Sequence, residues 1–230
     1  MLLIISPEEK YIKNLIDKYE HIKKNDGVLN DIYYAKYKEH EFLIALTGYG
    51  KVNITNALRR LCDTNNISVV ILIGTAGSIS DKNEIFNAVV FNNCLQYDID
   101  FSLNGCKPCV FPNENKGVFF TNEDLRNCLN RACLASGVNY SNDLIASGDM
   151  FVCNNNLSNS IRREYNAGAV DVESGVVGQF CDKYNIPFAG VKVISNFAYN
   201  NAIKQYNLYE QEAYEILQRI TNKFIKGYYE

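Results

Sequence analysis

Short apolar runs alternate with amphipathic segments along most of the chain. The apolar runs predict strands at residues 2–5, 42–47, 68–74, 143–148 and 186–195, with an alternating strand at 86–100. The amphipathic segments predict helices at residues 7–19, 52–65, 121–136 and 207–229, and residues 31–48 predict a hairpin. Nearly continuous apolar strands separated by helices are typical of a mostly parallel sheet that is covered on both faces. The pattern therefore predicts an α/β fold with a mostly parallel, mixed central sheet flanked by helices.

Composition favours one domain over residues 1–230. The chain has 230 residues, 47% of them hydrophobic, which is enough to bury a substantial core. There is no composition break, linker-like run or internal repeat, and the short asparagine-rich patches such as CNNNLSN are interpreted as loops or caps.

Charge and the first residues narrow the choice of partners. The 23 basic and 26 acidic residues give a net charge of −3 and are spread along the chain, so no footprint for nucleic acid is expected. The first apolar run is too short for a membrane span and lacks the features of a signal peptide. We expect a small-molecule partner, no nucleic acid, no membrane and a cytoplasmic location.

The cysteines and histidines argue against several common chemistries. The eight cysteines are expected to be free thiols, and a zinc site built from Cys106, Cys109, Cys128 and Cys133 is disfavoured because the last two lie on a predicted helix without a second C-x-x-C. Only two histidines are present, so a catalytic Ser-His-Asp triad or Cys-His pair is poorly supported. A dinucleotide fingerprint and a P-loop are also missing, so neither a metal nor a cofactor is expected.

Small or glycine-containing stretches follow four of the predicted strands. They are TGYGKVN (47–53), GTAGS (74–78), SGDMF (147–151) and SNFA (195–198). Ligands in open α/β sheets bind at the carboxyl ends of strands, where glycine lets backbone amides approach closely. We expect these stretches to meet at one ligand site.

Two acids interrupt the small and apolar segment AGAVDVESGVVGQF (167–180). On a helix beginning near Ala169, Asp171 and Glu173 would lie about 200° apart, so they would not form a carboxylate pair. Asp171 is then expected to be structural. Glu173, with no local cation, needs donors, and a sugar diol supplies them.

These stretches together resemble the nucleoside phosphorylase/nucleosidase superfamily, and most closely the 5′-methylthioadenosine/S-adenosylhomocysteine nucleosidases. The segments that carry the resemblance stand in family order and span nearly the whole chain: TGYGKVNITNAL, ILIGTAGSIS, QYDID, SGDMF, AVDVESG and IPFAGVKVISNFA. The resemblance implies a nucleoside phosphorylase-like fold, cleavage of the N-glycosidic bond of a purine nucleoside, and a homodimer.

The resemblance also implies roles for individual residues. Glu173 would hold the ribose hydroxyls, with Val172 packed beneath the sugar. Phe151 and the backbone at Val152 would contact the purine. Thr75, Ala76 and Gly77 would line the side of the base and the nucleophile.

Four positions depart from the family pattern. Asn196 stands where the family has its purine-protonating Asp, and an amide cannot deliver that proton. The family's water-activating Glu corresponds to Tyr11 when the positions are counted without gaps, and to Glu9 or Glu8 after a short deletion. Lys192 replaces an Arg, and Tyr97-Asp98 replaces His-Asp.

These departures leave three functions open. The chain is interpreted as a nucleosidase with a changed substrate or a slow rate. A purine nucleoside phosphorylase acting on 6-oxopurines is the alternative, although only Lys10 and Lys51 are candidates for a phosphate site. A non-catalytic nucleoside-binding protein on the same fold is the third.

Overall fold

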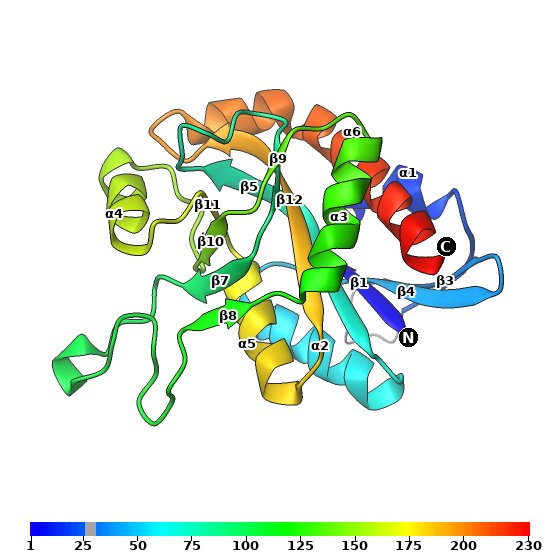
Figure 1. Ribbon diagram of the computed structural model, residues 1–230, viewed down its shortest axis with the longest axis horizontal. Coiled ribbons are helices and arrows are strands. Elements are labelled where there is room, and N and C mark those ends of the chain that lie inside the picture. The colour runs from blue at the N-terminus through cyan, green and yellow to red at the C-terminus, as the bar shows by residue number, and fades with distance from the viewer. Residues whose placement is uncertain (26–30) are drawn as a thin grey trace.

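A twelve-stranded sheet runs through the part of the chain that the structure describes, residues 1–25 and 31–230 of a computed structural model (Figure 1). The strands are β1 (Leu2–Ser6), β2 (Glu20–Lys24), β3 (Ile32–Tyr37), β4 (His40–Leu46), β5 (Val69–Ser78), β6 (Ala88–Val90), β7 (Asn93–Gln96), β8 (Val118–Phe120), β9 (Tyr140–Ser141), β10 (Leu144–Ser147), β11 (Ala169–Asp171) and β12 (Phe188–Phe197). The helices are α1 (Lys13–Ile16), α2 (Lys51–Thr64), α3 (Glu123–Ala135), α4 (Asn155–Tyr165), α5 (Ser174–Tyr184) and α6 (Ala202–Tyr229), with short 3₁₀ turns η1 (Glu9–Tyr11) and η2 (Ser102–Asn104).

The sheet mixes parallel and antiparallel pairs, and β11 pairs with β5 in antiparallel orientation near its centre. Strand β1 lies between β4 and β5, and β5 also pairs with β12, all in parallel. The hairpin β3–β4 and the pairs β2–β3 and β7–β8 are antiparallel. The predicted mixed α/β sheet is confirmed.

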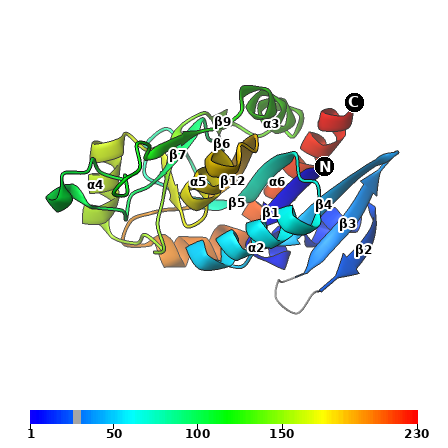
Figure 2. The same ribbon diagram turned by 90° about the horizontal axis from the view of Figure 1, so that it is seen from below.

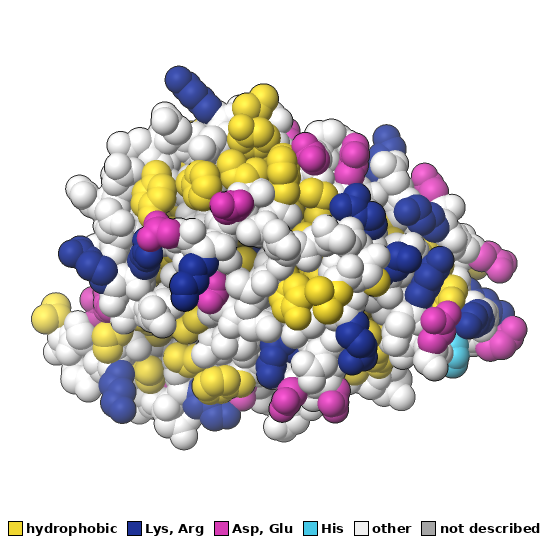
Figure 3. Space-filling view, turned by 45° about the horizontal axis from the view of Figure 1, so that its top comes forward, with side chains coloured by type: hydrophobic (Ala, Val, Ile, Leu, Met, Phe, Trp, Pro, Cys, Tyr) yellow, Lys and Arg dark blue, Asp and Glu magenta, His cyan; other side chains and the backbone are white. Residues whose placement is uncertain are grey.

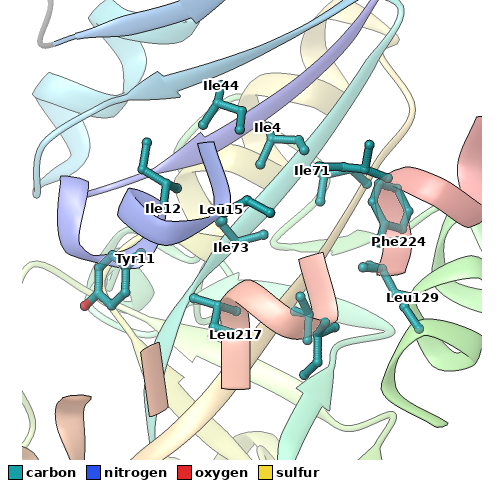
Figure 4. Close-up of a cluster of buried hydrophobic side chains, with 14 of the residues drawn as sticks. Ile4, Tyr11, Ile12, Leu15, Ile44, Ile71, Ile73, Leu129, Leu217 and Phe224 are labelled. Atoms are coloured by element: carbon teal, nitrogen blue, oxygen red, sulfur yellow. The ribbon is translucent and has the colours of Figure 1, made fainter. Parts of the chain in front are cut away.

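Helices cover both faces of this sheet. One face packs against α1, α3 and α6, and Figure 4 shows Leu15, Leu129 and Leu217 from these helices around Ile4 and Ile71 of the strands. The other face packs against α2 and α5, which lie together when the molecule is seen from below in Figure 2. Both apolar layers exclude water, so the central strands are buried on two sides, as their continuous apolar runs require. None of the helices in the described ranges is long and apolar enough to span a membrane.

The prediction of one long strand over residues 86–100 is wrong. The strand is interrupted at Phe91 and Asn92. Before this break, β6 pairs with β12 and β9, and after it β7 pairs with β10 and β8. The hydroxyl of Thr121 stabilises the break by donating to the carbonyl oxygens of Phe91 and Asn92, both at 3.0 Å. Alternation persists on each side of the break, so the pattern alone does not reveal the change of partner.

The polar ends of several elements also differ from prediction. Residues 7–19 form only η1 and α1, although the predicted apolar side is buried, including Tyr11, Ile12 and Leu15. The asparagine-rich patch CNNNLSN, expected to be a loop or a cap, contains a cap: Asn154 caps α4 by accepting from the backbone N–H groups of Asn156 and Leu157. Predicted helices 52–65, 121–136 and 207–229 are confirmed as α2, α3 and α6.

Two stretches expected as loops continue their strands. GTAGS is the last part of β5 and SNF the last part of β12, and the two remain paired in parallel. Their register shifts between Ile194 and Asn196, which marks a β-bulge at Ser195. A bulge re-aims the side chains that follow it, so it matters for the site described next.

Candidate active site

A cavity of about 550 Å³ opens at the carboxyl ends of the strands. Its size is typical of a site for a small organic molecule. The lining comes from the ends of six strands and from the start of α6: Glu8, Lys10, Tyr11, Tyr49, Gly50, Thr75, Ala76, Gly77, Asp149, Met150, Phe151, Val152, Val170, Asp171, Val172, Glu173, Ser195, Asn196 and Tyr206.

Most of the residues predicted for the site meet in this cavity. Those that line it are Thr75, Ala76, Gly77, Phe151, Val152, Val172, Glu173 and Asn196. Glu9 does not line it: its carboxylate accepts a hydrogen bond from Tyr33 at 3.1 Å, and Glu8 faces the cavity instead. Lys192 does not line it either, but its ammonium contacts Glu173, which does.

The expectation that Asp171 and Glu173 sit on opposite sides of a helix is wrong. Residues 169–171 form strand β11, and α5 starts only at Ser174. Both carboxylates meet the ammonium of Lys192, with Nζ–O distances of 3.0 Å to Asp171 and 2.5 Å to Glu173. The local cation missing from the sequence segment is therefore supplied by the middle of β12.

This buried ion cluster has two carboxylates for one ammonium. The side chains of Lys192, Asp171 and Glu173 are at most 3% exposed. Burial raises the pKa of Glu173 to about 7, against the lowering effect of the Lys192 charge, and the Asp171 carboxylate adds to the rise. Burial alone would lower the pKa of Lys192, but the two carboxylates outweigh it and raise that pKa. Glu173 is thus poised to change charge near neutral pH.

Neighbouring elements hold this cluster in place. Asp171 also caps α5 by accepting from the backbone N–H of Ser174 at 3.2 Å and from its hydroxyl at 2.6 Å. A side chain at Gly74 would place its Cβ 2.7 Å from Nζ of Lys192, so glycine there makes room for the ammonium. The cap of α5 and the floor of the cavity therefore share one residue, Asp171.

The bulge in β12 brings Ser195 and Asn196 to the cavity together. The hydroxyl of Ser195 donates to Oδ1 of Asn196 at 2.9 Å, which leaves the amide nitrogen of Asn196 as the donor toward the cavity. Gly77 lies against that nitrogen, since a Cβ at this position would come within 3.0 Å of it. The part of the cavity next to Asn196 thus presents a fixed, neutral hydrogen-bonding group.

Tyr11 lies between the apolar core and the cavity. Figure 4 shows its ring at the edge of the core cluster with the hydroxyl pointing away from it. That hydroxyl lies 3.2 Å from Oγ1 of Thr75 and 3.1 Å from the hydroxyl of Tyr49. Burial raises the pKa of Tyr11 well above its usual value, so the phenol stays neutral. Sequence counting without gaps indicated Tyr11, while Tyr206 carried no signal in the sequence.

The mouth of the cavity is aromatic. Phe151 is 45% exposed, and its ring lies 5.8 Å from that of Tyr206 in an edge-on arrangement. Val152 beside it is buried. A flat aromatic ligand would cover Phe151 and gain apolar contact there.

The predicted alternative chemistries find little support in the described residues. Lys51 pairs with Asp98 at 2.6 Å, and Lys10 pairs with Glu8 at 3.0 Å and Glu210 at 3.3 Å. All eight cysteines are free, and residues 1–25 and 31–230 contain no group of three or more His, Cys, Asp or Glu placed to hold a metal ion. On the face shown in Figure 3, basic and acidic side chains are interspersed.

Comparison with known proteins assigns the class. A sequence profile described as the phosphorylase superfamily matches residues 2–226, so the chain belongs to that superfamily. Within it, the chain is 30% identical to a 5′-methylthioadenosine/S-adenosylhomocysteine nucleosidase of Buchnera aphidicola, over 96% of this chain and 93% of the relative. It is 27% identical to the aminodeoxyfutalosine nucleosidase of Campylobacter jejuni, over 86% of both chains.

Solved structures confirm the fold. A 5′-methylthioadenosine/S-adenosylhomocysteine nucleosidase from Neisseria meningitidis superposes with a TM-score of 0.92, at 22% identity over 98% of each chain. Futalosine hydrolase of Helicobacter pylori gives a TM-score of 0.90, at 21% identity over 98% of this chain and 97% of that one. The predicted nucleoside phosphorylase-like fold is confirmed.

Proposed function

We propose that this protein hydrolyses the N-glycosidic bond of a purine nucleoside, releasing the free base and ribose. The observation that carries the proposal is Glu173: a buried carboxylate, held by Lys192, that faces a cavity of nucleoside size. Relatives named as nucleosidases support the same reaction.

Each wall of the cavity has a role in this proposal. Glu173 accepts hydrogen bonds from the 2′- and 3′-hydroxyls, with Val172 beneath the sugar. The purine lies on the Phe151 ring beside Val152, and Asn196 donates to a nitrogen or carbonyl of its edge. Thr75, Ala76 and Gly77 line the path by which water reaches C1′. As the bond to the base breaks, water adds its oxygen to C1′, and its two protons go to the sugar hydroxyl and the base.

Charge favours water over phosphate as the nucleophile. Among the described residues that line the cavity, Lys10 is the only basic one, and it is already paired with two carboxylates. Phosphorolysis needs a cationic site for the anion. A phosphorylase acting on 6-oxopurine nucleosides remains the second candidate, because the amide of Asn196 would donate to O6 or N7.

The third candidate is a nucleoside-binding protein without catalysis. The family's purine-protonating position holds the neutral Asn196, and its water-activating position holds the neutral Tyr11 when the positions are counted without gaps. Loss of a general acid removes a rate factor of about 10²–10⁴. We therefore propose slow hydrolysis.

We also propose a homodimer in the cytoplasm. Three residues that line the cavity are exposed by 40% or more, Tyr49, Met150 and Phe151, and Val52 at the start of α2 is exposed too. Their two segments are joined where the backbone N–H of Lys51 donates to Asp149 at 3.1 Å, so they form one surface that a second copy would cover. Eight free thiols fit a reducing compartment. Sedimentation that finds only monomer at micromolar concentration would refute the dimer.

Release of free base tests the reaction. The protein is incubated with methylthioadenosine, adenosine, inosine and guanosine, each with and without phosphate. We expect release that does not depend on phosphate. Release only with phosphate would establish the phosphorylase, and no release combined with ligand-induced thermal stabilisation would establish the binder.

A further inference from the structure

One wall of the cavity is not used by the diol or the base. It is built by Glu8 and Lys10 after β1, Tyr49 after β4, and Tyr206 at the start of α6, with Tyr11 at its inner edge. We call these five residues the polar wall. Every one of them carries a hydrogen-bonding group.

Hydrogen bonds tie the polar wall together. The hydroxyl of Tyr206 accepts from Nζ of Lys10 at 3.3 Å and lies 2.8 Å from the hydroxyl of Tyr214. Tyr214 in turn donates to Glu210. At the inner edge, the hydroxyls of Tyr11 and Tyr49 lie 3.1 Å apart. The polar atoms are therefore held at fixed positions before a ligand arrives.

The charges of the polar wall leave no free cation. The ammonium of Lys10 contacts carboxylate oxygens of both Glu8 and Glu210, at 3.0 Å and 3.3 Å. Burial alone would lower the pKa of Lys10, but the hydrogen bonds that its ammonium donates to Glu8 and Tyr206 outweigh this and raise it, so the lysine stays charged. Two carboxylates and one ammonium repel a phosphate group. An alkyl or thioether group placed here would strip water from these polar atoms without replacing its hydrogen bonds.

The geometry of a ribonucleoside decides what meets this wall. With the 2′,3′ edge on Glu173 and the base between Phe151 and Asn196, the remaining substituent is C5′, which lies across the sugar ring from the base. The polar wall is the part of the lining left to receive it. A 5′-hydroxyl would donate to Glu8 and accept from Tyr49, because the single hydroxyl proton of Tyr206 already goes to Tyr214.

We infer that the polar wall makes this protein selective for nucleosides with an uncharged 5′-hydroxyl, over those with a 5′-thioether or a 5′-phosphate. The inference rests on the proposed function, because it needs Glu173 and Asn196 to hold the diol and the base. It separates this chain from relatives whose names specify methylthioadenosine. Glu8 and Tyr49 are the specificity-determining residues.

Binding of C-nucleosides tests the inference without turnover, because their carbon–carbon glycosidic bond is not hydrolysed. Calorimetry compares formycin A and formycin B with their 5′-deoxy, 5′-methylthio and 5′-phosphate forms. We expect the 5′-hydroxyl form to bind about 10-fold or more tightly than each of the others. Equal or tighter binding of a methylthio or phosphate form overturns the inference and leaves the nucleosidase standing. Failure of every compound to bind overturns the proposed function as well.

Variants locate the selectivity. Glu8→Met combined with Tyr49→Phe replaces polar atoms with apolar ones of similar size, and should reduce the preference for hydroxyl over methylthio to about 2-fold or less. Tyr37→Phe is the matched control, since it also removes a tyrosine hydroxyl, one that donates to Glu230 outside the cavity lining. An unchanged preference in the double variant overturns the assignment of these residues.

Discussion

The floor of the cavity, formed by the cluster around Lys192, differs in charge from the side at Asn196, which we propose for the base. The floor concentrates three ionisable groups, Lys192, Asp171 and Glu173, in a buried cluster. The base side presents Asn196 and Ser195, which hydrogen-bond to each other and carry no charge. Tyr11, elsewhere in the lining, is neutral too. The contrast teaches that the cavity concentrates its charge around Lys192 and leaves the groups at Asn196 and Tyr11 neutral.

The largest expected effect breaks the charge balance of the floor. Lys192→Met leaves two buried carboxylates without their cation, and should lower the free energy of unfolding by about 3–5 kcal/mol. Urea denaturation at neutral pH measures it. Lys183→Met is the control: its partner is Glu114 on the surface, and it should cost less than about 1 kcal/mol. Equal losses in both variants would show that the buried charge is not needed.

The next largest effect is expected when Asn196 is replaced by an acid. Asn196→Asp should accelerate base release by about 10²–10⁴-fold, because a carboxyl can protonate the leaving purine. Initial rates with adenosine and inosine measure it. Asn200→Asp makes the same change at an exposed amide that bonds to Asn155 and should leave the rate unchanged. A rate unaffected by Asn196→Asp would mean that protonation of the base does not limit the reaction.

Removing the charge of the sugar grip comes third. Glu173→Gln should weaken nucleoside binding by about 100-fold, since the hydroxyls lose a charged acceptor. Free adenine or hypoxanthine, which has no ribose, should bind as before. Glu215→Gln, at an exposed carboxylate bonded to Gln211, serves as the control in the same calorimetric titrations. Unchanged nucleoside affinity would remove Glu173 from the sugar site.

The smallest effect is a pH dependence of the same grip. The pKa of Glu173 is raised to about 7, so the carboxyl is protonated below that pH and ionised above it. Only the ionised form accepts from both ribose hydroxyls, so affinity should rise by about 10-fold from pH 6 to pH 8 and then level off. The Glu173→Gln variant should show a flat profile. Affinity that falls over this range would contradict the assignment.

The fold was predictable where a buried face makes hydrophobic residues recur at regular intervals in the sequence. The central strands and the helices α2, α3 and α6 bury apolar faces, and their patterns identified them. Strand β2 is exposed at every position and α4 is polar, so neither leaves a hydrophobic signal. The division of residues 86–100 into two strands was not predicted for another reason. The alternation of apolar and polar residues does not encode which strand is the pairing partner.

The site was predictable to the extent that it follows strands. Eight of the ten residues predicted for the site line the cavity, because the ends of the strands converge on one edge of the sheet. Lys192 offered one more signal: a lysine inside an otherwise apolar buried strand needs a carboxylate partner. Which carboxylate it meets was not readable, because Asp171 and Glu173 were placed on a helix that starts only after them.

The sequence by itself determined the superfamily, the layered α/β sheet and the carboxylate at position 173, since local periodicity and short segments encode them. Only the tertiary structure decided that Lys192 balances two acids at once, that a bulge turns Ser195 and Asn196 to the cavity, and that Glu8 rather than Glu9 faces it. These facts depend on strand register and on contacts between residues far apart in the chain. The polar wall is the clearest case, since Lys10 and Tyr206 are separated by 196 residues and meet only in the folded protein.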